Sequence, residues 1–485
     1  MARHRLGVLL CCVLLLEGCS GWLRQGSPTA FEAKADNQEP SPASQQRPWL
    51  KLATTDEPSA VFLLNGEPFC FQGSNNYYLI FKSKRMAESV FDNATKIGLR
   101  VLRHWAFTDR GSVDGRVAAV DPDGTKEGVY FQYWDPVNQR PAYNDGANGL
   151  ERLDQVVAEA REAGIRMVLV LTNNWRDFGG MDQYLVWYGL HEHAQFYTDE
   201  RVKRAYKDWI AHIVNRVNTV TGIVYKDDPY VFAWELANEP RTRNYKDFGS
   251  ADGWDKHTIS TWAEEMTAFV RSLDPNHLIA VGDEGFFSRN RESFYNGDDG
   301  VDHDALLALP EVDYGTFHLY PETWGTGLGW GGRWIVDHLE AARKAGKPSV
   351  LEEYGVVVER DAKTDAILQF GDRRERAYEL WNELMLRQGG AGSMFWMLAG
   401  YDDVLKKNYK DYDHFSVYSP ETDPSARLLR EYAQRFAKEA RACQLARKWG
   451  VVPKRPVPTD FVTVSVDPRN VLSSVPRTRA EHHRE

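Results

Sequence analysis

The sequence has few cysteines and no excess of positive charge. Of its 485 residues only five are cysteine, and three of these, Cys11, Cys12 and Cys19, lie near the N-terminus. The tripeptide His191–His193 lacks further ligands at a spacing that suits a metal, so we expect it on a loop surface. The formal net charge is −10, which gives nucleic acid or an anionic membrane no general electrostatic attraction. We therefore expect no metal, no cofactor and no nucleic-acid partner.

Long apolar runs are also missing, except for one near the N-terminus. The run LGVLLCCVLLL follows the basic MARHR and is too short to cross a bilayer comfortably. The next residues, LEGCSG, place Cys19 after a small residue, which resembles a bacterial lipoprotein cleavage box with a lipidated cysteine. Glu17 departs from that pattern, so ordinary secretory cleavage is the alternative. We expect residues 1–19 to be an export signal and the protein to be anchored to a membrane at the cell surface or in the periplasm, or secreted.

Three further segments differ in composition. Residues 20–48 are polar and rich in Ser, Pro and Gln, which indicates a disordered tether. Residues 49–444 have the composition of one large domain, and residues 445–485 form an extension of unknown role. Cys70 and Cys443 are the remaining cysteines; an exported pair could form a disulfide, and two separate buried thiols are the alternative.

Short apolar runs alternate with amphipathic segments from about residue 60 onward. Helical spacing is clear in GLERLDQVVAEAREAG and DERVKRAYKDWIAHIVNRV. Eight strand–helix units predict a (β/α)₈ TIM barrel of the α/β class, with long loops on its catalytic face. The expected strands are 69–76, 100–107, 166–174, 231–239, 277–284, 314–320, 348–355 and 392–398.

Unusual polar residues stand at the C-terminal ends of these runs. In a TIM barrel those ends open onto one face, where the chemistry takes place. The fourth run ends in WELANEPR and brings Glu239, and the seventh ends in LEEYG and brings Glu353. A single glutamate there would be a salt-bridged rim residue by default. Two carboxylates at matching strand ends are what cleavage of a glycosidic bond requires.

The neighbours of the two glutamates suit that chemistry. Asn238 can donate to a sugar hydroxyl, and Arg103 and Tyr320 can hydrogen-bond Glu353 and keep it ionised. Glu239 must be protonated to act as an acid, so we expect burial or the charge of Glu353 to raise its pKa. The 16 tryptophans and 22 tyrosines would serve a large core, and flat aromatic platforms also suit sugar rings.

Seven ordered motifs make the resemblance specific. LRHWAF, LTNNWRDFGGMDQY, FAWELANEPR, GDEGF, FHLYPETWG, LEEYG and MFWM occur in the order found in family 5 glycoside hydrolases. NNW…GGMDQY and GTFHLYPETWG resemble its β-mannanase branch. The resemblance spans residues 60–440. It implies a retaining hydrolase acting on β-1,4-mannan or manno-oligosaccharides, and we expect a monomer.

The resemblance also implies residue roles. Glu239 would be the acid/base and Glu353 the nucleophile, while Glu352 should point to the opposite side because side chains alternate along a strand. Trp175 would line the cleft, and Arg241 would contact the leaving-group side. Trp105 would line the cleft too, although core packing is an equal alternative. The residues expected around the reacting sugar are Arg103, Asn238, His318, Tyr320 and Trp396.

Two long segments leave the mode of cleavage open. Residues 111–149 follow the second strand, and residues 401–420 follow the eighth. Loops this long are commonly functional, and either could close one end of a groove. We expect endo-acting cleavage, with an exo-acting β-mannosidase or mannobiohydrolase as the alternative. A β-glucanase on the same scaffold and a glycan-binding lipoprotein without activity are the less favoured interpretations.

Overall fold

The structure is a computed structural model, and it describes residues 50–54, 60–124, 127–243, 255–358 and 372–448. The expected export signal with Cys19, the tether and most of the C-terminal extension lie outside these residues. The side chain of Cys443 does too, so the disulfide with Cys70 stays an expectation. No helix in the described part of the chain combines the length and the apolar character needed to cross a membrane.

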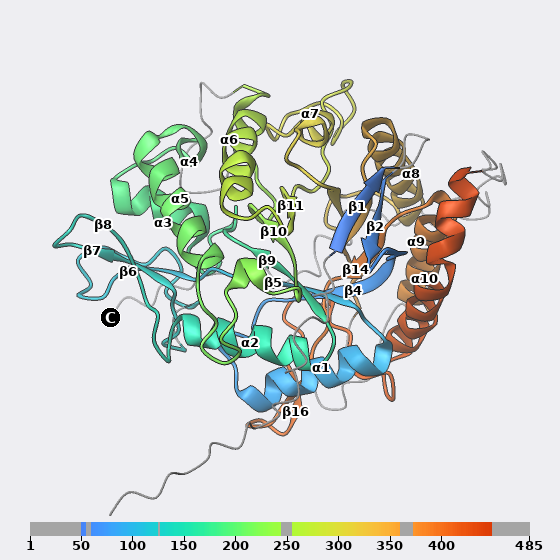
Figure 1. Cartoon of the computed structure of the whole chain (residues 1–485), viewed down its shortest axis with the longest axis horizontal. Coiled ribbons are helices and arrows are strands. Elements are labelled where there is room, and N and C mark those ends of the chain that lie inside the picture. The colour runs from blue at the N-terminus through green and yellow to red at the C-terminus, as the bar shows by residue number, and fades with distance from the viewer. Residues whose placement is uncertain (1–49, 55–59, 125–126, 244–254, 359–371, 449–485) are drawn as a thin grey trace, which may run out of the picture. The chain divides into compact units, whose positions relative to one another are not determined.

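Eight parallel strands form the barrel sheet (Figure 1). Each of the eight expected runs contains one of them, which confirms the predicted fold. The observed strands end earlier than predicted, because the polar residues at the C-terminal end of several runs lie in the loops that follow. The strands are β4 (Phe71–Asn76), β5 (Val101–Trp105), β9 (Arg166–Val170), β10 (Val231–Glu235), β11 (Leu278–Ala280), β12 (Gly315–Leu319), β13 (Ser349–Tyr354) and β14 (Gly392–Phe395).

The strand order is β11-β10-β9-β5-β4-β14-β13-β12, so the first barrel strand, β4, pairs with the last, β14. Between β11 and β12 the sheet continues through single contacts. The backbone N–H of Asp313 donates to the carbonyl of Ile279 at 2.9 Å, and that of His318 donates to the carbonyl of Glu284 at 3.1 Å. The barrel is therefore nearly closed.

Helices follow the strands and bury their apolar faces against the sheet. Local sequence sets their ends: the Ser83 hydroxyl caps α1, and Gly98 ends it with φ of 87°, a conformation that favours glycine. Asp199 caps α5 in the same manner. The helices are α1 (Lys84–Ile97), α2 (Leu150–Glu162), α3 (Gly180–Tyr188), α4 (Gln195–Thr198), α5 (Glu200–Val214), η1 (Tyr225–Asp227), α6 (Thr258–Leu273), α7 (His303–Ala308), α8 (Leu328–Ala345), α9 (Arg373–Gln388) and α10 (Pro424–Lys448).

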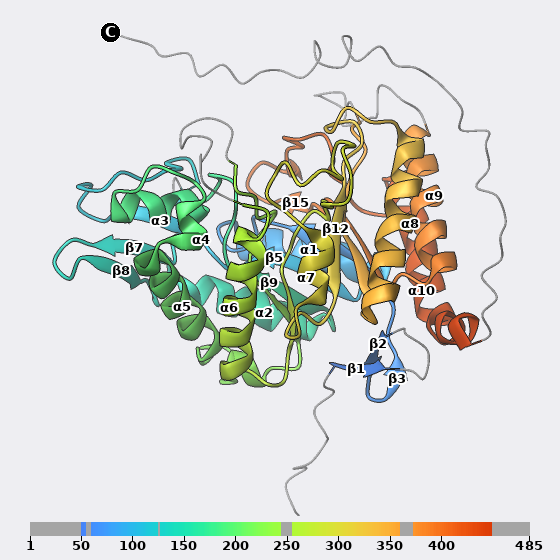
Figure 2. The same ribbon diagram turned by 90° about the horizontal axis from the view of Figure 1, so that it is seen from above.

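A small antiparallel sheet covers the N-terminal end of the barrel, and sequence analysis did not predict it. It contains β1 (Leu50–Thr54), β2 (Ala60–Leu64) and β3 (Glu67–Pro68), which lie away from β15 in Figure 2. Phe62 of β2 packs edge-on against Phe232 of β10 at 5.4 Å between ring centroids. The apolar plug formed here contains Phe62, Phe69, Phe71, Phe232 and Tyr314, all buried.

The two long loops fold differently. The first contains a three-stranded sheet, β6 (Asp109–Ser112), β7 (Gln132–Asp135) and β8 (Arg140–Tyr143), beside α3 (Figure 1). The second contains the short hairpin β15 (Tyr401–Asp402) and β16 (Lys407–Asn408). Part of the first loop is apolar, GVYFQYWDP, and β7 forms within it.

Candidate active site

Glu239 lies four residues beyond the end of β10, in a strained backbone conformation. Its φ is 52°, which a residue other than glycine rarely adopts. The backbone N–H donates to the carbonyl of Gly282 at 2.9 Å, which holds the turn against the loop after β11. The strain is therefore supported by the neighbouring loop and fixes where the carboxyl group points.

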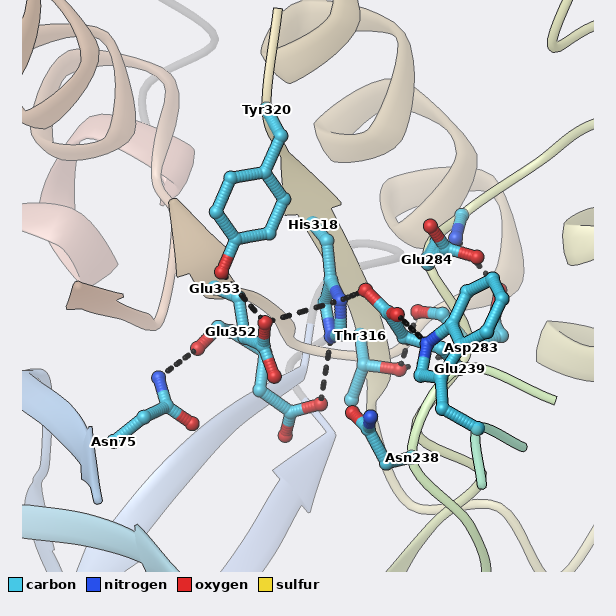
Figure 3. Close-up of polar contacts among 12 residues, drawn as sticks. Asn75, Asn238, Glu239, Asp283, Glu284, Thr316, His318, Tyr320, Glu352 and Glu353 are labelled. Atoms are coloured by element: carbon cyan, nitrogen blue, oxygen red, sulfur yellow. Dashed lines mark hydrogen bonds and ion pairs between the residues drawn. The ribbon is translucent and has the colours of Figure 1, made fainter. Parts of the chain in front are cut away.

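The Glu239 carboxyl group accepts hydrogen bonds from two rings. His318 Nδ1, at the end of β12, lies 2.7 Å from Oε1, and Trp175 Nε1 donates to Oε2. Figure 3 shows His318 between Glu239 and Glu353. The predicted cleft residue Trp175 thus touches the carboxyl group that we expected to be the acid/base.

Glu353 lies on β13 and is held from two sides. Tyr320 Oη donates to its Oε2 at 2.7 Å, and the guanidinium of Arg103 donates to its Oε1. These are the two contacts predicted for Glu353, and both are confirmed. His318 Nδ1 is 3.7 Å from Glu353 Oε2.

The prediction that Glu352 points to the opposite side is wrong. Phe317 pairs with Leu351 and His318 pairs with Glu353, so Glu352 is an extra residue in β13, a β-bulge. The bulge breaks the alternation of side chains, and both glutamates face the barrel interior. Figure 3 shows Glu352 beside His318, and Glu352 Oε2 lies 3.7 Å from His318 Nε2.

The two predicted catalytic carboxyl groups are close together. Glu239, His318 and Glu353 each offer an atom, and these atoms all lie within 4.8 Å of one another. Inverting hydrolases separate their carboxyl groups by about 6.5–9.5 Å to admit a water molecule, and retaining hydrolases by about 5–5.5 Å. The separation of the Glu239 and Glu353 carboxyl groups is that of the retaining hydrolases. Because hydrogen bonds from His318, Trp175, Arg103 and Tyr320 already occupy these oxygens, the arrangement suits acid–base chemistry better than metal binding.

Arg103 is the cation at the centre of the site and is fully buried. It donates to Glu235 Oε2 from Nε at 2.9 Å, to Asn75 Oδ1 at 3.1 Å and to Asn238 Oδ1 at 2.8 Å. Asn238 donates one N–H to Asn173, and its amide carries a second N–H that can reach a sugar hydroxyl. Glu235 is not among the residues predicted for the site, although a lone carboxylate inside the apolar run VFAWEL was a usable signal.

The pKa of Glu239 was expected to be raised, and in the free site it is lowered. Burial raises its pKa, but the hydrogen bond and charge of His318 and the charge of Arg241 outweigh burial and lower the pKa to about 2. For His318 burial lowers the pKa, whereas Glu353, Glu239 and Glu352 raise it well above its ordinary value. Burial raises the pKa of Glu353 against the charges of His318 and Arg103. Without substrate, the proton shared with Glu239 therefore resides on His318.

Arg241 forms a buried ion pair beside Trp175. Its Nε and one terminal nitrogen lie 2.6 Å and 2.7 Å from the two oxygens of Glu284, and Asp299 lies 3.4 Å away. Its guanidinium carbon is 5.2 Å from the Trp175 ring centroid. Arg241 thus helps to fix the indole that contacts Glu239.

Trp396 and Trp105 form an aromatic wall. Their ring centroids are 5.8 Å apart, and Tyr77 stacks on Trp396 at 6.1 Å. Trp105 is 5% exposed, so most of its surface serves packing, the alternative that sequence analysis had left equal. Trp396 Nε1 donates to Asp413 Oδ2 at 2.7 Å, a contact from the second long loop that no sequence signal indicated.

The expectation that His191–His193 lies on a loop surface is wrong for His193, which is buried. Its Nδ1 is 2.8 Å from Asp182 Oδ1, and its Nε2 is 2.9 Å from Asn174 Oδ1. Asn174 Oδ1 also accepts from the backbone N–H of Arg241. The side chain is internal because it supports the turn that carries Glu239 and Arg241.

Known proteins resemble this chain over most of its length. The sequence profile described as GH family 5 beta-mannosidase-like matches residues 55–438. The mannan endo-1,4-beta-mannosidase F of Aspergillus fumigatus is 35% identical over 75% of this chain and 74% of its own length. An endo-1,4-beta-mannanase structure from Rhizomucor miehei is 34% identical with a TM-score of 0.70, covering 80% of this chain and 99% of that one. The endo-1,4-beta-D-mannanase structure from Thermotoga petrophila is 41% identical with a TM-score of 0.64, covering 76% and 100%.

Proposed function

Because the chain belongs to glycoside hydrolase family 5, in its β-mannosidase-like group, we propose that it is an endo-acting β-1,4-mannanase. The single observation that carries this proposal is the pair of carboxyl groups on Glu239 and Glu353, which come within 4.8 Å across His318. Both solved structures described above are of endo-mannanases.

In the proposed reaction Glu353 attacks the anomeric carbon and the bond to the leaving sugar breaks. Glu239 is ionised in the free site and therefore takes up a proton as substrate binds. It gives that proton to the departing oxygen, and then removes a proton from the water that hydrolyses the glycosyl–Glu353 ester. Two inversions give net retention. The hydrogen bonds from Arg103 and Tyr320 to Glu353 support its role, because they favour a carboxylate that is aimed and ready to attack.

The remaining predicted residues would bind sugar. Asn238 and Arg103 form the floor around the reacting ring, Trp396 offers a flat face, and Trp175 with Arg241 adjoins the acid/base on the leaving-group side. Stacking on an aromatic ring suits the apolar C–H face of a sugar. His318 and Tyr320 complete this set by contacting the two carboxyl groups.

Viscosity and reducing ends measured together on soluble mannan test endo action. Internal cleavage lowers viscosity early, while few ends have formed. Release of mannose or mannobiose with nearly constant viscosity would instead show the exo-acting alternative, and shortening of residues 111–149 should then increase internal cleavage.

Rates of hydrolysis of mannohexaose and cellohexaose, measured side by side, separate a mannanase from a β-glucanase. Proton NMR of the first product tests retention, and a binding protein without activity would produce no reducing ends.

The cellular location rests on sequence alone. The basic residues, the apolar run and Cys19 support export followed by lipidation, with a monomeric enzyme on a tether of residues 20–48. Cys19→Ala should release the protein from the membrane fraction or block its processing. Unchanged fractionation of this variant would favour ordinary secretion, or another form of attachment, over lipidation at Cys19.

A further inference from the structure

A second pair of carboxyl groups lies next to the catalytic pair. Glu352 and Glu235 are both fully buried and both approach Arg103. Glu235 receives its hydrogen bonds from Arg103, whereas neither oxygen of Glu352 has a hydrogen-bond partner among the described residues. The nearest cationic nitrogens to Glu352 Oε2 are Arg103 Nε at 3.6 Å and His318 Nε2 at 3.7 Å. A buried carboxyl group placed in this way needs an explanation.

Charge balance limits the states of this cluster. Glu235, Glu239, Glu352 and Glu353 are four carboxyl groups, and Arg103 with a protonated His318 supplies two positive charges. Four ionised carboxylates would leave two buried negative charges without compensation, which is costly. Arg241 does not remove this excess, because its guanidinium is engaged by Glu284. The cluster must therefore hold protons in addition to the one on His318.

The β-bulge decides where Glu352 acts. Without the extra residue Glu352 would face away from the barrel interior, and Nε2 of His318 would have no carboxyl group beside it. Nε2 has no hydrogen-bond partner among the described residues, so the carboxyl group at 3.7 Å is its main electrostatic neighbour. A ring nitrogen facing an anion stays protonated more readily.

We propose that Glu352 is a positioning residue that acts through His318. Its carboxyl group, facing Nε2, keeps both ring nitrogens of His318 protonated, so that Nδ1 donates to Glu239 throughout the reaction. This inference rests on the roles proposed for Glu239 and Glu353 and adds a residue behind them. Glu235 completes the arrangement by accepting the hydrogen bonds of Arg103.

The other charged groups support this assignment. Burial raises the pKa of Glu235 to about 8 against the charge of Arg103, and the charge of Glu352 adds to the rise. The titratable and charged groups that face His318 and Glu352 from the surrounding elements are Arg103, Glu235, Glu239, Arg241, Glu284, Tyr314, Tyr320 and Glu353.

A fixed cation at His318 suits a double displacement. When Glu353 becomes an ester it loses its negative charge. When Glu239 gives up its proton it gains a negative charge, so the total charge is unchanged. The negative charge moves from one side of His318 to the other. Nδ1 lies 2.7 Å from Glu239 and 3.7 Å from Glu353, so the same imidazolium stabilises both states.

The test compares pH profiles of kcat/KM for Glu352→Gln and Glu352→Asp. Removing a negative charge weakens proton binding throughout a coupled cluster. Both limbs of the Glu352→Gln profile should therefore move to lower pH, by about one unit or more, since a charge within about 4–6 Å shifts a pKa by about 1–3 units. Glu352→Asp keeps the charge and should keep the profile. Glu159→Gln, a carboxyl-to-amide change in α2, is the matched control and should leave the profile in place.

A fall in kcat with an unmoved profile would overturn the proposal and leave Glu352 a structural residue. A second measurement does not depend on any Glu352 variant: ¹⁵N NMR of the His318 imidazole in the unaltered enzyme, assigned with His318→Asn. We expect both nitrogens protonated at pH 7, and a neutral ring from pH 5 to 8 would overturn the proposal. Because this spectrum is independent of turnover, it separates a failure here from a failure of the mannanase assignment.

Discussion

The same eight strands form two opposite kinds of interior at the two ends of the barrel. At the N-terminal end Phe62, Phe71 and Phe232 pack as rings that need no partner beyond one another. At the C-terminal end Arg103, Glu353 and the other ionisable groups are equally buried, and each depends on the charge of its neighbours. Apolar burial at the N-terminal end stabilises the fold. The C-terminal end places charged groups around the two glutamates proposed to be catalytic. Variants of the two ends should therefore fail in different ways.

Glu353→Ala should give the largest effect. Without a nucleophile no glycosyl-enzyme can form, so kcat on both mannan and aryl mannosides should fall by about 10⁴-fold or more, as for nucleophiles elsewhere. The thermal midpoint should hold or rise, because one buried carboxyl group is removed from an acidic cluster. Calorimetry beside the kinetic assay checks both parts. A variant that unfolds would show that the charged end also carries stability.

Glu239→Ala should affect substrates unequally. General acid catalysis contributes about 10²–10⁴-fold, so hydrolysis of mannan should fall in that range while activated aryl mannosides lose far less in their first step. Azide should restore turnover of aryl mannosides by replacing the base of the second step. Equal losses on both substrate types without rescue by azide would argue against the assigned role.

Phe232→Ala should reverse this pattern. Loss of a buried phenylalanine ring costs about 3–5 kcal/mol of unfolding free energy, through lost contacts and the cavity that remains. kcat/KM of the folded fraction should stay near that of the unaltered enzyme, because Phe232 lies at the plug. Denaturant unfolding and active-site titration measure the two quantities, and Phe232→Leu should show a smaller loss of stability. A kinetic defect in folded Phe232→Ala would show that the two ends are coupled.

Asp413→Asn tests a contact from the second long loop. It weakens the hydrogen bond to Trp396 Nε1, and a bond to a charged group is worth about 1.5–3 kcal/mol. We expect KM to rise by about tenfold, with kcat changed less, because Trp396 would lose its fixed orientation. Asp403→Asn in the same loop, which contacts Ser83, is the control. Equal KM values for Asp413→Asn and the unaltered enzyme would remove this loop from substrate binding.

The most gradual effect is the dependence of stability on pH. Burial raises the pKa of Glu235 and of Glu284 to about 8, although Arg103 and Arg241 respectively oppose the rise. A raised folded pKa means that the folded state binds more protons, so unfolding free energy should decrease as pH rises from about 4.5 to 8, on the order of 1 kcal/mol per pH unit. Glu284→Gln should flatten this slope, whereas Phe232→Ala should lower the whole curve. Denaturant unfolding at several pH values measures it.

The sequence predicted the barrel because each strand is an apolar run with a boundary, and it predicted Glu239 and Glu353 because they end two such runs. It did not predict Glu352 facing inward, because one extra residue in β13 depends on pairing with β12. The buried place of His193 and the contact of Asp413 with Trp396 also arise from segments far apart in the chain. Such contacts follow from packing, which no local pattern records.

The pairing of β4 with β14 has a consequence for the order of folding. Gln72 donates to the carbonyl of Ser393, 321 positions later, so the first barrel strand cannot be completed until almost all of the domain has been synthesised. Phe62 likewise cannot be buried until Phe232 and Tyr314 have been synthesised. A ribosome adding about 5–20 residues per second would keep this aromatic surface exposed for tens of seconds. The nascent chain thus remains open to chaperones and aggregation until its final strand emerges.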